Sequence, residues 1–116
     1  MFGLQLELER RPEGGVAGRF FVKQDHQGPP GQAHGGILAA ALDETMALLL
    51  HGQGTRALTG RLEVDLSAPA PVGAFVDVEA DVDRAEERRI EVGARASVEG
   101  ELVAEARGVF VRADDR

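Results

Sequence analysis

The sequence contains no Cys, no Trp, no Tyr and no Asn, and Lys23 is its single Lys. Without Cys the chain forms no disulfide framework and no thiolate metal site, and it has no thiol nucleophile. Asp and Glu outnumber Lys and Arg by 20 to 13, and the formal charge of −7 opposes binding to nucleic acid or to an anionic membrane. The first residues lack an apolar signal core, so we expect no export and predict a cytoplasmic protein.

The remaining composition is that of a globular protein, with 43% hydrophobic and 28% charged residues over 116 positions. This length supports one core, so we predict a single domain over residues 1–116. The longest apolar run, Ile37 to Leu50, consists of good helix formers, and Gly52 after it suits a left-handed helix end. About 14 residues are too few to cross a hydrocarbon layer, so we predict a buried helix instead of a membrane span.

Elsewhere, apolar and polar residues alternate with the period of two that is typical of half-buried strands. The expected strands cover residues 4–9, 16–23, 61–67, 76–82, 90–98 and 102–110. The last three are expected to pair as consecutive antiparallel neighbours. The order of elements predicts an α+β fold in which one long helix lies against one antiparallel sheet of about six strands. Because such a sheet has open edges, we expect at least a dimer.

The segment before the helix, from Asp25 to Gly36, is rich in Gly and Pro. Gly35 and Gly36 open the helix, where the first N–H groups lack partners and carry partial positive charge. These donors are suited to stabilising a carbonyl oxygen that gains negative charge, as in an oxyanion hole. The alternative is that the two glycines only permit tight packing of the helix on the sheet.

Asp43 and Glu44 are the only acids within the apolar helix run, where an unpaired carboxylate is costly. Asp43 shares a helix face of small and polar residues with Gly36, and this face suits either a ligand or a second subunit. A partly solvated stripe is the simpler alternative. His34 and Asp43 are nine residues apart, about 13 Å along a helix, so one chain cannot bring the helix start to Asp43. Antiparallel helices of two subunits would bring them together.

The run Gly31-Gln-Ala-His-Gly-Gly36, followed by Asp43-Glu44 and by Thr59, resembles hot-dog-fold acyl-CoA thioesterases of the phenylacetate-degradation type. The resemblance covers residues 16–111. It implies a long central helix wrapped by a curved antiparallel sheet, and dimers, or dimers of dimers, with active sites at the subunit interface. It also implies hydrolysis of an aryl- or medium-chain acyl-CoA without a metal or a cofactor, since coenzyme A is part of the substrate.

The resemblance implies a role for each matching residue. Asp43 corresponds to the carboxylate that acts as general base on water or as nucleophile, and the Gly35 N–H polarises the thioester carbonyl. His34 orients the loop, and Thr59 positions the water or the carboxylate. Many members have Asn or Gln where this chain has Gly28. The neighbouring Gln27 is the candidate replacement for that second donor.

Further residues are candidates for substrate binding: Gly36 at the helix start, and Arg56 and Arg61 for the phosphates of coenzyme A. The arginines between residues 84 and 89 form either a solvated turn or another phosphate contact. The three His residues and Asp25 do not have the spacing of a common metal site. Two other functions fit the residues less well. They are a hot-dog hydroxyacyl thioester dehydratase that uses His26, and an acyl-CoA binding module without catalysis.

Overall fold

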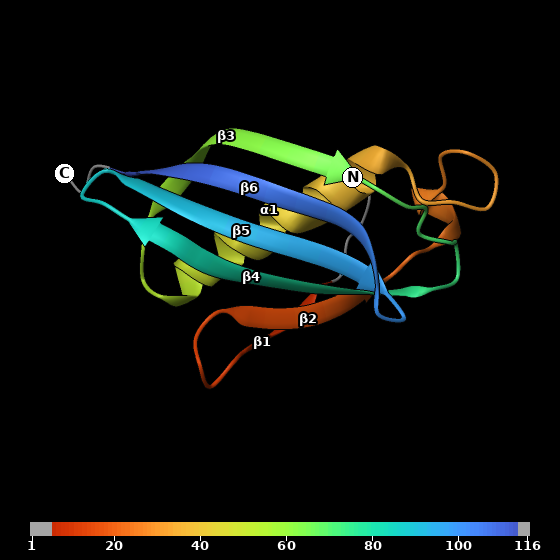
Figure 1. Cartoon of the computed structure of the whole chain (residues 1–116), viewed down its shortest axis with the longest axis horizontal. Helices are drawn as coiled ribbons and strands as arrows, with labels where there is room; N and C mark the ends of the chain where they lie inside the picture. The colour runs from red at the N-terminus through yellow and green to blue at the C-terminus, as the bar shows by residue number, and fades with distance from the viewer. Residues whose placement is uncertain (1–5, 114–116) are drawn as a thin grey trace.

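One antiparallel six-stranded sheet lies against one long helix in residues 6–113, the part of the computed structural model described here (Figure 1). The helix is α1 (Gly35–Gly52), and the short 3-10 helix η1 (Gln24–His26) precedes it. The strands are β1 (Glu7–Arg10), β2 (Val16–Phe21), β3 (Ala57–Leu66), β4 (Phe75–Ala85), β5 (Arg89–Val98) and β6 (Glu101–Arg112). The sheet order is β1-β2-β4-β5-β6-β3, so β1 and β3 form its edges. The predicted α+β architecture is confirmed.

The three last strands pair as predicted, β4 with β5 and β5 with β6. The turn between β5 and β6 is made by Glu99 and Gly100, both with positive φ (50° and 84°), as a two-residue hairpin turn requires. β3 does not pair with β4, its neighbour in sequence. It crosses to the far edge and pairs with β6, which leaves its other side without a partner strand in residues 6–113.

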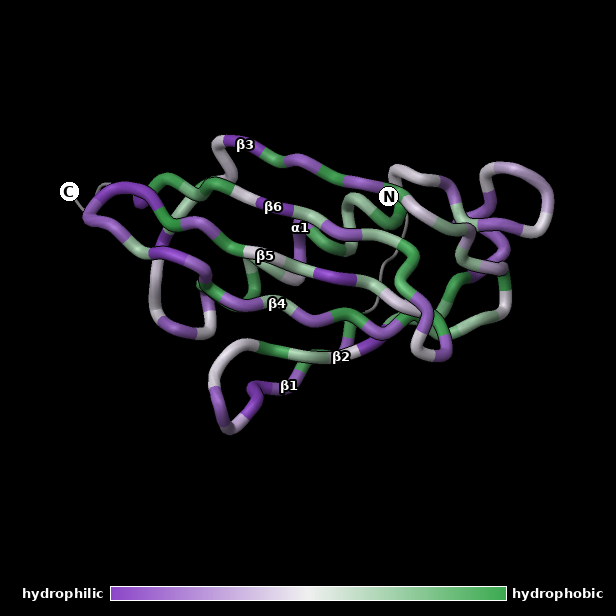
Figure 2. Tube along the Cα trace, in the orientation of Figure 1, coloured by the Kyte–Doolittle hydropathy of each residue, from purple (hydrophilic) through white to green (hydrophobic). Residues whose placement is uncertain are grey.

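The core lies between α1 and the inner face of the sheet. Hydropathy alternates along the strands (Figure 2). In β4 and β5 the buried residues alternate with exposed ones, so the apolar side chains face the helix and the polar ones face outward. The inner faces of β5 and β6 carry many small residues, which lets the helix approach closely. At Gly108, an added Cβ would lie 2.8 Å from Cε1 of Phe110 and 3.2 Å from the Sδ and Cε atoms of Met46, so glycine makes room for both side chains.

The helix is buried on one side only. The side chains of Leu38, Leu42, Met46 and Leu49 are buried, as predicted. Gly36, Ala40, Ala47 and His51 are exposed on the opposite face, and Asp43 on that face is half-buried. No helix in the described part of the chain is long and apolar enough to span a membrane.

Several boundaries differ from the prediction: β3 begins at Ala57 and not at residue 61, and β4 continues to Ala85 and not to residue 82. The helix continues through Gly52, and the left-handed glycine after it is Gly54 (φ 78°), so the assignment of Gly52 as the left-handed stop is wrong. β2 ends at Phe21 because the chain turns into η1. β1 begins at Glu7, and residues 4 and 5 of the predicted first strand lie outside the described residues. An additional contact ends the helix: the Arg10 guanidinium donates to the Gly52 carbonyl (2.7 Å).

Candidate active site

A clamped loop positions the start of α1. The His34 N–H donates to the carbonyl of His26 (2.7 Å), and the Ala33 N–H donates to the carbonyl of Ala70 (2.8 Å). His26 is itself buried, and its Nδ1 accepts from the Lys23 N–H (3.0 Å). The residues just before the helix are therefore tied both to η1 and to the segment that connects β3 to β4.

His34 is the N-cap of the helix. It has an extended backbone (φ −63°, ψ 138°), and its Nδ1 accepts from the Gly36 N–H (2.9 Å). This cap satisfies one of the free donors of the first turn. The N–H of Gly35 has no acceptor within residues 6–113. The helix start thus presents one unpaired donor, at the end where the helix dipole is positive.

Gly28 and Gln27 shape the same loop from the other side. An added Cβ on Gly28 would lie 2.9 Å from the Cα of His34, so this close approach admits glycine alone without a shift of the backbone. The family's Asn or Gln at this position is thus sterically excluded here. Gln27 uses its Oε1 to accept from the Gly31 N–H (2.7 Å), which closes the loop. Because Oε1 already accepts from Gly31, the Nε2 group of Gln27 is the part of its side chain that can donate to a ligand.

Asp43 and Thr59 come together within one chain. The Thr59 hydroxyl donates to Oδ1 of Asp43 (3.0 Å), across the gap between α1 and β3. The structure gives Oδ2 of Asp43 no hydrogen-bond partner among the described residues. One carboxylate oxygen is held in place, and the other is available to a proton donor.

A β-bulge explains why Thr59 faces the helix. The pairing of β3 with β6 shifts between Thr59 and Arg61, with Gly60 as the extra residue. Beyond the bulge, Leu66 lies on the helix side, within reach of Gly35, and Arg61 lies on the outer side. In a regular strand Thr59 and Arg61 would share a face. The bulge instead directs Thr59 toward Asp43 and Arg61 away from it.

The helix start and the carboxylate remain apart in one chain. Gly35 and Asp43 belong to the same straight helix and are eight residues apart, or about 12 Å. Gly35 and Asp43 are both half-buried, the helix face around Asp43 is exposed, and the outer edge of β3 has no partner strand among residues 6–113. A second copy of the chain can therefore reach both groups.

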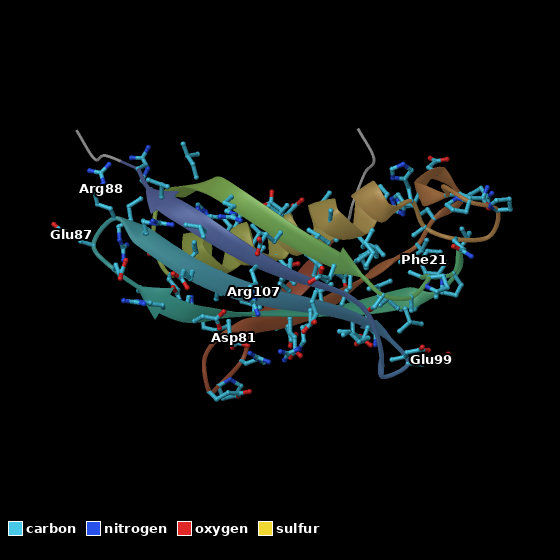
Figure 3. The ribbon with its side chains drawn as sticks, turned by 45° about the horizontal axis from the view of Figure 1, so that its top comes forward. Phe21, Asp81, Glu87, Arg88, Glu99 and Arg107 are labelled. Carbon is cyan, nitrogen blue, oxygen red and sulfur yellow. The ribbon has the colours of Figure 1, made fainter. Side chains whose placement is uncertain are left out.

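The candidate arginines lie away from Asp43 or in charged surroundings. Arg61 is paired with Glu63 (3.0 Å) on the outer face of the sheet, and Arg84 is paired with Glu86 (2.8 Å). The turn with Glu87 and Arg88 lies at the end of the sheet opposite the helix start (Figures 1 and 3). Arg56 is exposed just before β3, and its carbonyl accepts from the Ala113 N–H.

The outer face of the sheet is strongly acidic. A hollow of about 350 Å³ there is lined by Glu63, Asp65, Asp81, Asp83 and Glu105, together with Arg95 and Arg107. Asp81 and Arg107 are visible on this face in Figure 3. A hydrogen bond and ion pair with Asp81, together with Glu79, raise the pKa of Arg11. These carboxylates oppose phosphate binding on the outer face.

The other histidines do not join this site. His26 is buried beneath the loop, and its Nδ1 accepts from the Lys23 N–H, so it does not join Asp43 on the exposed helix face. His51 is exposed in the last turn of α1. Within residues 6–113, no group of three or more His, Asp or Glu side chains is placed to hold a metal ion.

Several features of the site were not predicted from the sequence. The clamp at His26 depends on the path of the loop before the helix, and the bulge at Gly60 and the contact of Leu66 with the helix start depend on contacts between distant segments. Gly60 within an alternating pattern was the one available signal, since an isolated glycine in a strand is typical of a bulge.

Comparison with known proteins identifies the family. Residues 30–105 match the model of the thioesterase superfamily. The acyl-coenzyme A thioesterase THEM4 of Xenopus laevis is 32% identical over 91 residues, which are 74% of this chain and 40% of that protein. The chain spans 36% to 40% of the length of the first curated relatives it matches.

Solved structures agree over almost the whole chain. A mutant form of the phenylacetic acid degradation protein PaaI from Thermus thermophilus is 29% identical, with a TM-score of 0.85, over 97% of this chain and 95% of that one. A Bacillus halodurans protein solved with CoA is 27% identical, with a TM-score of 0.83, over 95% and 75%. The hot-dog fold and the resemblance carried by the His-Gly-Gly and Asp-Glu residues are confirmed.

Proposed function

The chain belongs to the thioesterase superfamily, and on that basis we propose that it hydrolyses an acyl-CoA to the free acid and coenzyme A. The observation that carries this proposal is the hydrogen bond from Thr59 to Asp43. It holds a carboxylate on the exposed face of the same helix whose first N–H is unpaired. Thioester hydrolysis needs a base and an oxyanion donor, and it requires neither a metal nor a cofactor.

The Gly35 N–H is the proposed oxyanion donor. In the reaction, water adds to the thioester carbon, and the carbonyl oxygen gains negative charge. A preorganised backbone donor at a helix start stabilises that charge more than it stabilises the neutral carbonyl. Gly36 N–H already donates to His34, so His34 has a positioning role and Gly35 contacts the substrate.

Asp43 is the proposed general base. Its Oδ2 takes a proton from the attacking water while Thr59 holds Oδ1. When the tetrahedral intermediate collapses, the C–S bond breaks and the sulfur leaves as the thiolate of coenzyme A. The thiolate then takes up a proton. A single turnover in the presence of hydroxylamine tests this assignment, because a nucleophilic Asp43 would form a mixed anhydride with the acyl group, which hydroxylamine traps, whereas a general base forms no covalent intermediate.

We further propose that two subunits build each site, in a dimer or a dimer of dimers. The Gly35 N–H of one subunit and Asp43 of the other meet when the two helices lie antiparallel. The open edge of β3 and the exposed helix face support this arrangement. The Gln27 amide and Arg56 are the proposed additional contacts for the substrate, and Arg61 contacts the phosphates only if a partner subunit brings them to the outer face.

The proposed substrate is an aryl- or medium-chain acyl-CoA. The likeness to PaaI supports the aryl group, and the CoA-bound relative supports the carrier. Participation in phenylacetate degradation and a cytoplasmic location remain predictions from the resemblance and the composition.

Hydrolysis by an Asp43→Asn variant tests the mechanism. We expect at least a hundredfold lower kcat for phenylacetyl- or hexanoyl-CoA, about the contribution of a general base. Release of the free thiol is the measurement. Glu44→Gln is the matched control, because Glu44 is the adjacent acid and its side chain is exposed. Equal rates for wild type and Asp43→Asn would refute the mechanism.

The same assay separates the two other functions. Tight binding of acyl-CoA by the wild type without thiol release would identify a binding module. Hydration of an enoyl-CoA without thiol release would identify a dehydratase. The burial of His26 argues against the second outcome.

A further inference from the structure

An apolar groove of about 300 Å³ lies beside the helix start. It runs between the loop before α1, the first turn of the helix and the end of β3, where the chain leaves the sheet. The residues that line it, all in the described part of the chain, carry no charge, and Gln32 alone has a polar side chain. The hollows on the outer face of the sheet, by contrast, are lined by carboxylates and arginines.

Gly35 belongs to the lining of this groove and also carries the unpaired N–H. Leu66 lies directly over it, since an added Cβ on Gly35 would be 2.8 Å from the Leu66 Cδ1. Because Gly35 is part of the groove wall, a carbonyl oxygen bound by this N–H would bring its substituents close to the groove. The uncharged lining suits the acyl group and not the phosphates of coenzyme A.

From this arrangement we propose that the groove holds the acyl group and that Leu66 limits its size. The inference rests on the proposed function and extends it to substrate selection. A dry cavity of roughly 150 Å³ accommodates benzene. A groove of twice that volume fits an aryl ring or a chain of similar bulk. Leu66 forms the adjustable wall, as its side chain is 53% exposed, whereas Ala70 on the opposite side is fully buried.

Two measurements test this proposal with the same set of variants. The first is kcat/KM for straight-chain acyl-CoA substrates from four to twelve carbons. The second is calorimetric binding of S-hexyl- and S-dodecyl-coenzyme A, thioethers that cannot be hydrolysed. The readout in both is the ratio of the long-chain to the short-chain value, which a uniform loss of folded protein does not change.

We expect Leu66→Ala to raise this ratio about tenfold, because the truncation makes room for roughly two further methylene groups. Leu66→Phe lowers the ratio by a similar factor. Ala68→Leu narrows the groove from another segment and has the same effect as Leu66→Phe, so the test does not depend on one variant that folds poorly. Leu62→Ala is the control, since Leu62 is on the same strand and does not line the groove.

A ratio that stays within twofold of wild type in all three groove variants overturns the inference. If hydrolysis is present and the ratio does not move, only the inference fails. If the thioether ratio moves and no acyl-CoA is hydrolysed, only the hydrolytic mechanism fails. A wild type that neither binds thioethers nor releases thiol overturns both.

Discussion

Thr59 and Asp43 form the residue contact on which the proposed chemistry depends. The Thr59 hydroxyl restrains one carboxylate oxygen at 3.0 Å, and a site of this kind loses activity when its base is free to rotate. Thr59→Val keeps the shape of the side chain and removes the donor. We expect kcat to fall about tenfold, the cost of one hydrogen bond to a charged group, with KM nearly unchanged.

Thr59→Ser restores the hydroxyl and is expected to recover most of the activity. Steady-state kinetics on one acyl-CoA substrate measures both variants. A Val variant as active as the wild type would show that this hydrogen bond has no part in the reaction.

Gly35 can be tested by removing its N–H alone. Pro is well tolerated at the first position of a helix, and the extended His34 before it is compatible with a following Pro. Gly35→Pro and Gly35→Ala both place a carbon atom near Leu66, and only Pro removes the donor. We expect the Pro variant to be at least a hundredfold slower in kcat than the Ala variant. Equal rates in the two variants would exclude Gly35 as the oxyanion donor.

At the level of elements, the cap of α1 links stability to activity. His34→Ala removes the acceptor for the Gly36 N–H and is expected to lower the free energy of unfolding by about 1 kcal/mol. The loosened helix start should also lower kcat. Asn is a good N-cap, so His34→Asn is expected to recover both quantities. Urea unfolding and thiol release measure them. An Asn variant that is stable and inactive would contradict a purely positioning role for His34.

The strands were predictable where apolar and polar residues alternate along the sequence. Alternation along β4, β5 and β6 predicted three adjacent strands, and the Glu99-Gly100 pair predicted their last turn. The position of β3 was not predictable in this way, because β4 and β5 lie between it and its partner β6 in the sequence. The helix end also moved, since Gly52 and Gly54 are equally suitable in sequence and only the backbone distinguishes them.

In the site, too, the features formed by neighbouring residues were predictable, and those formed by distant segments were not. The Gly-rich start of α1 and the acid within it were visible in the sequence. The bulge that turns Thr59 inward and Arg61 outward arises from the pairing of β3 with β6, so the sequence alone could not separate these two candidates. The groove at Leu66 likewise requires the end of β3 to meet the helix start.

At the scale of the whole molecule, one chain supplies two unlike halves of the proposed site. Gly35 and Asp43 are fixed about 12 Å apart by the helix that carries both. The exposed helix face and the open edge of β3 are the surfaces at which we expect a second copy to pair. Sedimentation of the wild type as a dimer or tetramer is the expected behaviour.

Subunit complementation tests the two-chain site most directly. Asp43→Asn and Gly35→Pro chains are each expected to be inactive alone. When they are unfolded together and refolded at equal amounts, half of the dimers are mixed, and each mixed dimer has one intact site. We therefore predict recovery of about a quarter of the wild-type rate of thiol release. No recovery in mixed dimers, isolated by two different affinity tags, would contradict the two-chain site.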